Sequence, residues 1–401
     1  MKKWRNYIPE GTRDILFDKC SLKKEIENSI RNTYINSGFH QVETPTIEFY
    51  DVFDFKDNGI PQESMYKFFD AKGRILVLRP DYTIPVARVV ASKVDQLPMK
   101  FFYSGEVFKP SDSFSGKDSE ITQAGVEIIG EGSIRSEIEL ILRAIEALEN
   151  CGLDNFKIEL GESNFYRKII ESIEIDDMEK EKLTRLVRNK NIGLINEFLK
   201  KEGATLTKES KDLIRMLPEL FGEIDILDKV SNYIPNSLQK DIDKLRAIYD
   251  GLKMLGYEKY ISIDLGMVSN LNYYTGITIK GYVDNFGEEI LSGGRYDKVF
   301  CEFGEKTPAA GLAFNINNIL EVLFNKSIAT KKSKILIHYE LDQLKVVLDK
   351  EKELITKGYE VELSLYEDIE KSKEYGKAKG FNKFIAISKE DIIEEDLGAV
   401  K

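Results

Sequence analysis

Six short segments hold the residues of this 401-residue chain whose types and spacing suggest chemistry. They combine carboxylates, amides, hydroxyls and phenols, which can donate hydrogen bonds to, and accept them from, a small polar ligand. General-base catalysis by histidine is a poor candidate, because the chain has only two histidines, His40 and His338. In chain order the segments are Pro9–Asp14, Gly38-Phe39 with Thr44–Glu48, Leu78–Thr83, Gln123–Glu127, Tyr273–Gly276, and Gly293–Asp297 with Pro308–Gly311.

The composition excludes several classes of protein. A net charge of −11 repels polyanions on average, which counts against RNA binding. The three cysteines, Cys20, Cys151 and Cys301, lie far apart without histidines nearby, so we expect no disulfide framework, no metal site and no cofactor. No apolar run of roughly 18 residues is present, and we therefore expect a cytoplasmic protein without a membrane span.

The elements that must position these segments alternate between helix and short strand. Residues 22–37 show helical apolar spacing and lead into an extended stretch at 41–47. This mixture predicts an α+β domain with a largely antiparallel sheet. Further strands are expected at 75–78, 101–103, 124–129, 156–160, 261–265, 278–282 and 289–291.

Changes in composition and apolar spacing along the chain predict its domains. The main domain is expected over residues 1–325, interrupted at 164–259 by a charged, helix-favouring insertion. A basic hinge at Lys331–Lys334 precedes a small α/β domain at 331–401. There the order is a strand at 335–337, a helix at 344–357, a strand at 360–365, a helix at 369–379 and a strand at 384–387, which favours a parallel sheet.

Taken together and in order, the six segments resemble histidyl-tRNA synthetase, a class II aminoacyl-tRNA synthetase, across about residues 5–325. The resemblance implies the class II catalytic fold, in which helices flank an antiparallel sheet. It also implies a helical insertion, a self-dimer formed through the Gly38–Glu48 region, and a C-terminal domain similar to a shortened anticodon-binding domain.

The resemblance further implies a site for free histidine. Positions matching the family's ammonium contacts are Asp81, Tyr82, Thr83 and Gln123, with aspartate replacing the family's glutamate. Positions matching its imidazole contacts are Glu127, Tyr273 and Tyr274, and Glu127 is expected to accept from a ring N–H. Each residue also has a structural interpretation: the tyrosines as strand packing, Gln123 and Glu127 as exposed strand residues, Asp81 as a turn acid.

Three arginines that handle ATP in the family are missing. The matching positions are Ser104, Ser269 and Asn318, so no residue is assigned a catalytic role. At ~3 kcal/mol of transition-state stabilisation for each arginine, their joint loss would slow adenylation by about six orders of magnitude. Lys109 or Lys117 could replace one arginine but not three. Two of these arginines also hold the carboxylate of histidine in the family, which leaves that group without an assigned anchor.

Synthetase-like chains that lack these arginines are similar to the regulatory subunit of ATP phosphoribosyltransferase. That resemblance implies a partner, the short-form catalytic subunit, in a hetero-octamer of four and four, with L-histidine as a feedback effector of histidine biosynthesis. The alternative is a diverged histidyl-tRNA synthetase, favoured by the C-terminal domain. A regulator that binds uncharged tRNA is a third interpretation, weakened by the absence of a basic, aromatic-rich stretch.

Overall fold

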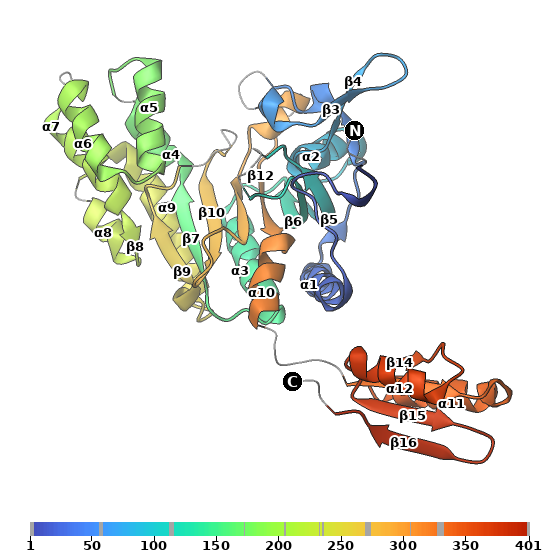
Figure 1. The fold of residues 1–401 in the computed structure, drawn as a ribbon. Coiled ribbons are helices and arrows are strands. Elements are labelled where there is room, and N and C mark those ends of the chain that lie inside the picture. The colour runs from blue at the N-terminus through green and yellow to red at the C-terminus, as the bar shows by residue number, and fades with distance from the viewer. Residues whose placement is uncertain are drawn as a thin grey trace. The chain divides into compact units, whose positions relative to one another are not determined.

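The computed structural model describes residues 4–55, 59–111, 116–171, 173–203, 206–231, 233–234, 236–268, 274–304, 306–326 and 333–398. The chain divides into two compact units, Met1–Phe324 and Asn325–Lys401 (Figure 1). Lys331 and Lys332 of the expected hinge lie outside the described residues.

A nine-stranded sheet forms the centre of the larger unit. Its neighbouring strands are antiparallel except for the pairs β1–β5 and β7–β9, as expected for the α+β class. Segments far apart in sequence therefore become neighbours. In spatial order the strands are β1 (His40–Gln41), β5 (Met99–Phe108), β6 (Glu120–Ile129), β12 (Ala309–Asn315), β11 (Leu291–Arg295), β10 (Ile277–Val283), β7 (Phe156–Glu162), β9 (Ile261–Asp264) and β8 (Phe221–Gly222).

Helices cover one face of this sheet and bury the main hydrophobic core. They are α1 (Phe17–Asn36), α3 (Ile134–Asn150), α9 (Asn236–Lys253) and α10 (Ile316–Lys326). In α3 the buried residues Leu140, Ala144 and Leu148 recur every fourth position and pack against Phe102 and Val126 of the sheet. Desolvation of these apolar side chains stabilises the layer by roughly 2 kcal/mol each.

A second, smaller core lies on the opposite face, at the β5–β6 end of the sheet. It contains Tyr82, Ile84, Tyr103 and Tyr296. Helix α2 (Thr83–Lys93) covers this end together with a three-stranded antiparallel sheet in the order β2 (Ile47–Phe49), β4 (Ile75–Leu78), β3 (Lys67–Phe69) (Figure 1).

The segment between β7 and β9 folds mainly as helices, at the other end of the sheet (Figure 1). Side-chain caps begin three of them, because Asp176, Asn191 and Thr207 each accept a hydrogen bond from a first-turn N–H. An ion pair of 2.8 Å between Lys190 and Asp264 joins this segment to β9. Before α9 the helices are α4 (Ser163–Glu171), α5 (Asp177–Arg188), α6 (Ile192–Lys201), α7 (Lys208–Met216) and α8 (Asp225–Ser231).

The C-terminal unit has a four-stranded sheet in the order β14-β13-β15-β16. Its first three strands are parallel, as expected, and its two helices lie on opposite faces, each with its own small core. The antiparallel strand β16 was not expected, because two isoleucines followed by acids show no alternation. Its elements are β13 (Lys334–Tyr339), α11 (Leu344–Thr356), β14 (Glu360–Leu363), α12 (Ile369–Ala378), β15 (Lys383–Ile387) and β16 (Ile392–Asp396).

Two central strands, β11 and β12, were hard to predict from the sequence because they contain glycine. Strand β12, with Ala-Ala-Gly at its start, was not predicted, and β11 runs through Gly293-Gly294 beyond the expected end at Leu291. A Cβ on Gly293 would lie 2.3 Å from the carbonyl oxygen of Gly311. These glycines are therefore required for the close approach of β11 and β12, although the residue type disfavours strands.

Candidate functional site

The register of the sheet brings distant polar residues onto one face. Glu127 lies opposite Gly311, Gly311 opposite Gly294, and Gly294 opposite Thr278. Directly paired residues share a face, so these four positions form a row across β6, β12, β11 and β10. Gln123, four residues before Glu127 on β6, points to the same face. The glycines in the row make room for the Glu127 carboxylate and the Tyr274 ring, which lie over them.

Glu127 is the centre of a buried hydroxyl cluster. Its Oε1 accepts from Thr83 Oγ1 at 2.8 Å and from the Tyr103 hydroxyl at 3.3 Å. Its Oε2 accepts from the Tyr296 hydroxyl at 2.5 Å. Only 1% of the residue is exposed. Direct acceptance of a ligand N–H by Glu127 was predicted, but both oxygens already accept hydrogen bonds from protein hydroxyls.

Burial sets the protonation of this glutamate. Desolvation raises the pKa of Glu127 to about 8, although hydrogen bonds from Tyr296 and Thr83 oppose the shift. The negative charge of Asp81 raises the pKa further. The carboxyl group is therefore mostly protonated at neutral pH and then donates one of its hydrogen bonds. A polar but nearly uncharged cluster results.

The three residues at the start of α2 have different roles. Asp81 Oδ1 accepts from the N–H of Ile84 at 2.9 Å and so caps the helix, while burial raises the pKa of Asp81. The Tyr82 ring lies between the Arg79 guanidinium, 4.0 Å from its centroid, and the Tyr103 ring at 4.3 Å. Thr83 donates to Glu127. Tyr82 is therefore a packing residue in this structure, and Thr83 orients the glutamate.

The tyrosine pair is only partly described. Tyr274 is buried, and its ring fits over Gly294, where a Cβ would come within 2.9 Å of a ring carbon. Its carbonyl accepts from Arg167 Nη2 at 2.6 Å. Tyr274 thus borders the row of polar positions. Tyr273 and Ser269 lie outside the described residues.

The structure corrects the assignment of Ser104. Ser104 pairs with Ala124, and both lie on the face of Phe102 and Val126 that packs against α1 and α3. An arginine here would point away from Glu127. The prediction that Ser104 marks a missing arginine of this site is therefore wrong. The error is one of register, because neighbouring strand residues point to opposite faces.

A lysine supplies positive charge near Asp81, in place of the arginine that the family has at the position of Ser104. Burial raises the pKa of Asp81, and the positive charge of Lys109, which follows Phe108 at the end of β5, opposes this rise. Lys109 is one of the two lysines, with Lys117, that were predicted as possible replacements for a lost arginine. Its ammonium is a compact point charge rather than a planar fork, so it cannot bind phosphate in the bidentate manner of arginine.

Asn318 lies at the beginning of α10, where it ties the helix to the β10–β11 connection. Its Nδ2 donates to the carbonyl of Glu289 at 2.8 Å and reaches Glu288 Oε2 at 3.5 Å. The Lys280 ammonium is 3.2 Å from the Glu289 carboxylate. These two acidic residues disfavour a polyphosphate beside Asn318.

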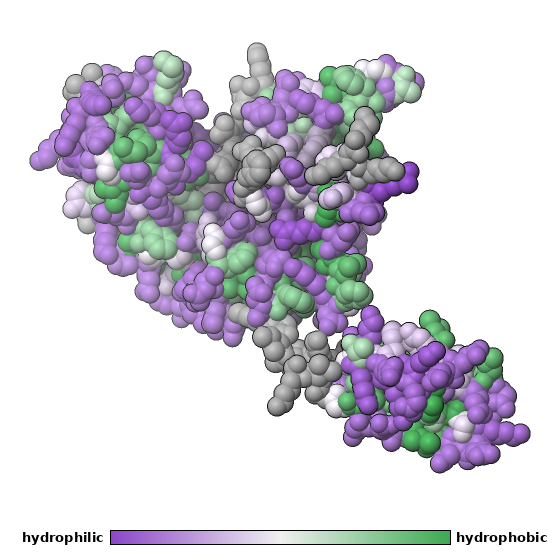
Figure 2. All heavy atoms as spheres, in the orientation of Figure 1, coloured by the Kyte–Doolittle hydropathy of each residue, from purple (hydrophilic) through white to green (hydrophobic). Residues whose placement is uncertain are grey.

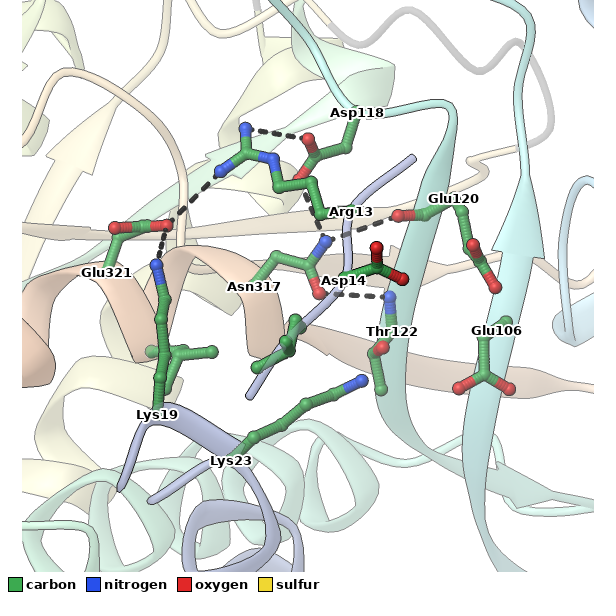
Figure 3. Close-up of a pocket in the computed structure, with 12 residues that line it drawn as sticks. Arg13, Asp14, Lys19, Lys23, Glu106, Asp118, Glu120, Thr122, Asn317 and Glu321 are labelled. Atoms are coloured by element: carbon green, nitrogen blue, oxygen red, sulfur yellow. Dashed lines mark hydrogen bonds and ion pairs between the residues drawn. The ribbon is translucent and has the colours of Figure 1, made fainter. Parts of the chain in front are cut away.

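A pocket opens on the opposite face, among α1, α10 and the ends of β5 and β6 (Figure 3). Arg13 from the first segment pairs there with Asp118 at 2.7 Å and Glu321 at 3.2 Å, and Lys19 lies 2.6 Å from Glu321. These ion pairs hold the N-terminal segment against α10. The pocket contains none of the predicted histidine-binding residues.

Three residues of the cluster were not predicted from the sequence. Tyr103 and Tyr296 donate to Glu127, and Gly311 makes room for it, since a Cβ there would lie 1.6 Å from Glu127 Oε2. Tyr296 and Gly311 belong to motifs that were noted but given no role. Arg295, beside Tyr296, points to the other face and pairs with the buried Glu137 at 2.8 Å.

Within the described ranges, no three side chains of the metal-binding types gather closely enough to hold an ion. No described helix is both long and apolar enough to cross a membrane.

Comparisons with known proteins show which family the chain belongs to. The family model for histidyl-tRNA synthetase matches residues 11–319. An ATP phosphoribosyltransferase regulatory subunit from Clostridium kluyveri is 41% identical over 392 residues, 96% of this chain and 100% of that protein. This chain belongs to the histidyl-tRNA synthetase family. A regulatory subunit of the same name from Clostridium botulinum is 42% identical and covers 100% of the chain and 96% of its own length.

Among solved structures, an ATP phosphoribosyltransferase regulatory subunit/histidyl-tRNA synthetase from Bacillus halodurans superposes with a TM-score of 0.83 at 25% identity, covering 96% of this chain and 99% of that one. The predicted family and the class II synthetase-like fold are therefore confirmed. The two full-length relatives of this chain named above are ATP phosphoribosyltransferase regulatory subunits.

Proposed function

We propose that this chain is the non-catalytic regulatory subunit of ATP phosphoribosyltransferase, which activates a short catalytic subunit and transmits feedback inhibition by histidine. The observation that carries the proposal is full-length similarity, near 40% identity, to proteins of that name. The relatives match both units of the chain. The C-terminal domain, which favoured a synthetase, is therefore compatible with a regulatory subunit.

The site supports a role in binding histidine rather than in activating it. Gln123, Asp81 and the hydroxyls of the cluster can hydrogen bond an ammonium and a ring nitrogen, while Glu127 orients those hydroxyls. Asn318 beside Glu288 is unsuited to adenine stacking or phosphate binding. Histidine that binds preferentially to an inactive arrangement of the complex would shift its population and inhibit catalysis.

Reconstitution with the short catalytic subunit tests this proposal. We expect formation of phosphoribosyl-ATP only when both chains are present, and inhibition of this activity by histidine. Gln123→Ala, which removes one polar group from the open face, should raise the histidine concentration for half inhibition by about tenfold while basal activation persists. Catalytic activity that is equal with and without this chain would contradict the proposal.

A diverged synthetase is the second candidate, because the matching family model bears that name. Histidine-dependent exchange between ATP and pyrophosphate separates the two functions. We expect no exchange above background, and a clear signal would favour the synthetase.

We further propose that the chain forms a self-dimer through the three-stranded sheet. Ile47 and Phe49 are exposed on one face of this sheet, and Phe69 and Ile75 are exposed on its other face. Figure 2 shows apolar side chains gathered where β3 and β4 lie. Exposed apolar patches of this kind mark protein interfaces. Ile47 belongs to the Gly38–Glu48 region named by the family resemblance.

Substitution of Phe69, which is 72% exposed, tests the dimer. A charge buried in an apolar interface costs several kcal/mol, so Phe69→Glu should give monomers in sedimentation velocity at micromolar concentration. Met178→Glu, at a residue of α5 that is 79% exposed, is the matched control and should leave the dimer intact. Equal sedimentation of both variants as dimers would rule out this interface.

A further inference from the structure

The C-terminal unit has a strand edge that no described element of this unit covers. β14 is the end strand of its sheet. The N–H of Glu360 donates to the carbonyl of Ser333 at 3.2 Å, and the N–H of Ser364 donates to Ile337 at 2.7 Å. Because bonding direction alternates along a strand, Val361 and Leu363 turn their N–H and C=O groups away from β13. Such an edge is a template for another strand.

Helix α11 places apolar side chains beside this edge. Val347 and Leu354 face the sheet and are buried, while Lys350 lies 3.9 Å from Glu394 of β16 and marks the flank toward that strand. At about 100° per residue, Leu344, Leu348 and Ile355 occupy the opposite flank, on the side of β14. All three are exposed. A helix flank that is apolar except for Glu351 thus runs along this edge.

The two faces of β14 differ in chemistry. Val361 and Leu363 pack toward α11, whereas Glu360 and Glu362 point to the other face. Both glutamates are exposed, although Lys334 lies 3.6 Å from Glu360 and the Tyr375 hydroxyl donates to Glu362 at 2.8 Å. A strand added here would meet apolar side chains on one face and carboxylates on the other.

These charges select among possible occupants. A second copy that paired antiparallel through β14 would place its own Glu360 and Glu362 beside this pair, and like charges side by side are destabilising. A nucleic acid would bring phosphates toward the same carboxylates. A protein segment with basic residues opposite the glutamates is complementary.

We propose that β14 and the Leu344–Leu348–Ile355 flank of α11 form a docking edge for an extended protein segment that alternates apolar and basic side chains. The segment adds as a fifth strand, so its backbone binds Val361 and Leu363, and its apolar side chains contact α11. Its basic side chains lie over Glu360 and Glu362. This inference does not depend on the proposed enzyme partner.

A fluorescent seven-residue peptide that alternates lysine and valine tests the docking edge on the full chain. We expect Leu348→Lys, at a residue 40% exposed on the docking flank, to weaken peptide binding by about tenfold. Val346→Lys adds the same charge on the same helix, at a residue 45% exposed on another flank, and should change affinity by less than about twofold. A peptide that alternates glutamate and valine should not bind.

Hydrogen exchange locates the contact. The N–H groups of Val361 and Leu363 should exchange more slowly when the lysine peptide is bound. Equal weakening by both lysine variants, which indicates general electrostatic attraction, would overturn the proposal. So would unchanged exchange at these two amides, or their protection at high protein concentration without peptide, which would identify a second copy as the occupant.

Discussion

Gly311→Ala will destabilise the larger unit by about 3 kcal/mol or more and abolish histidine binding. The new methyl group would lie 1.6 Å from Glu127 Oε2 and 2.6 Å from the carbonyl oxygen of Val126. Neither neighbour can move freely, because the carboxylate is held by three hydroxyls and the carbonyl belongs to a central strand. Overpacking of a rigid interior costs a few kcal/mol. Urea unfolding measures the stability, and calorimetry measures histidine binding.

Two comparisons separate this clash from the general effect of alanine. Gly287→Ala should change stability by less than about 0.5 kcal/mol, because nothing lies within 4 Å of the added Cβ. In a Glu127→Ala background the cost of Gly311→Ala should fall, since the side chain in closest contact is gone. An unchanged cost would show that the glutamate is not what requires glycine at 311.

The alternation of elements was predictable because it depends on local periodicity. α3 repeats its apolar residues every three or four positions, and the C-terminal β-α-β-α-β order follows from short apolar runs separated by turns. Strand β12 was not predictable in this way. Its small residues have low strand propensity, and it exists because glycine and alanine let β6, β12 and β11 lie close together.

The site was less predictable than the fold, because side-chain direction depends on register. Glu127 and Ser104 both lie in strands, and only the pairing of Ser104 with Ala124 shows that they point to opposite faces. Tyr296 reaches Glu127 across 169 residues of sequence. The types of residue predicted for a histidine site are present, but the central one, Glu127, already accepts hydrogen bonds from Thr83, Tyr103 and Tyr296.

Glu127→Gln will change how stability depends on pH. In the folded chain the acid keeps its proton up to a pKa of about 8, whereas in the unfolded chain it ionises near its ordinary value of 4.5. Between these values the folded state binds more protons, so this residue lowers wild-type stability progressively as pH rises, by at most about 1.4 kcal/mol per pH unit. Glutamine cannot ionise and removes this loss.

The difference in unfolding free energy between Glu127→Gln and wild type should therefore move in favour of the variant from about pH 5 to pH 8 and then level off. Glu162→Gln is a matched comparison, because burial raises the pKa of Glu162 to about 7 and its difference should level off earlier. Urea unfolding at pH 5, 6, 7 and 8 measures both. Parallel curves for wild type and Glu127→Gln would mean that the folded protein holds an ionised glutamate in the hydroxyl cluster. The site would then favour a cationic imidazolium rather than a neutral ring.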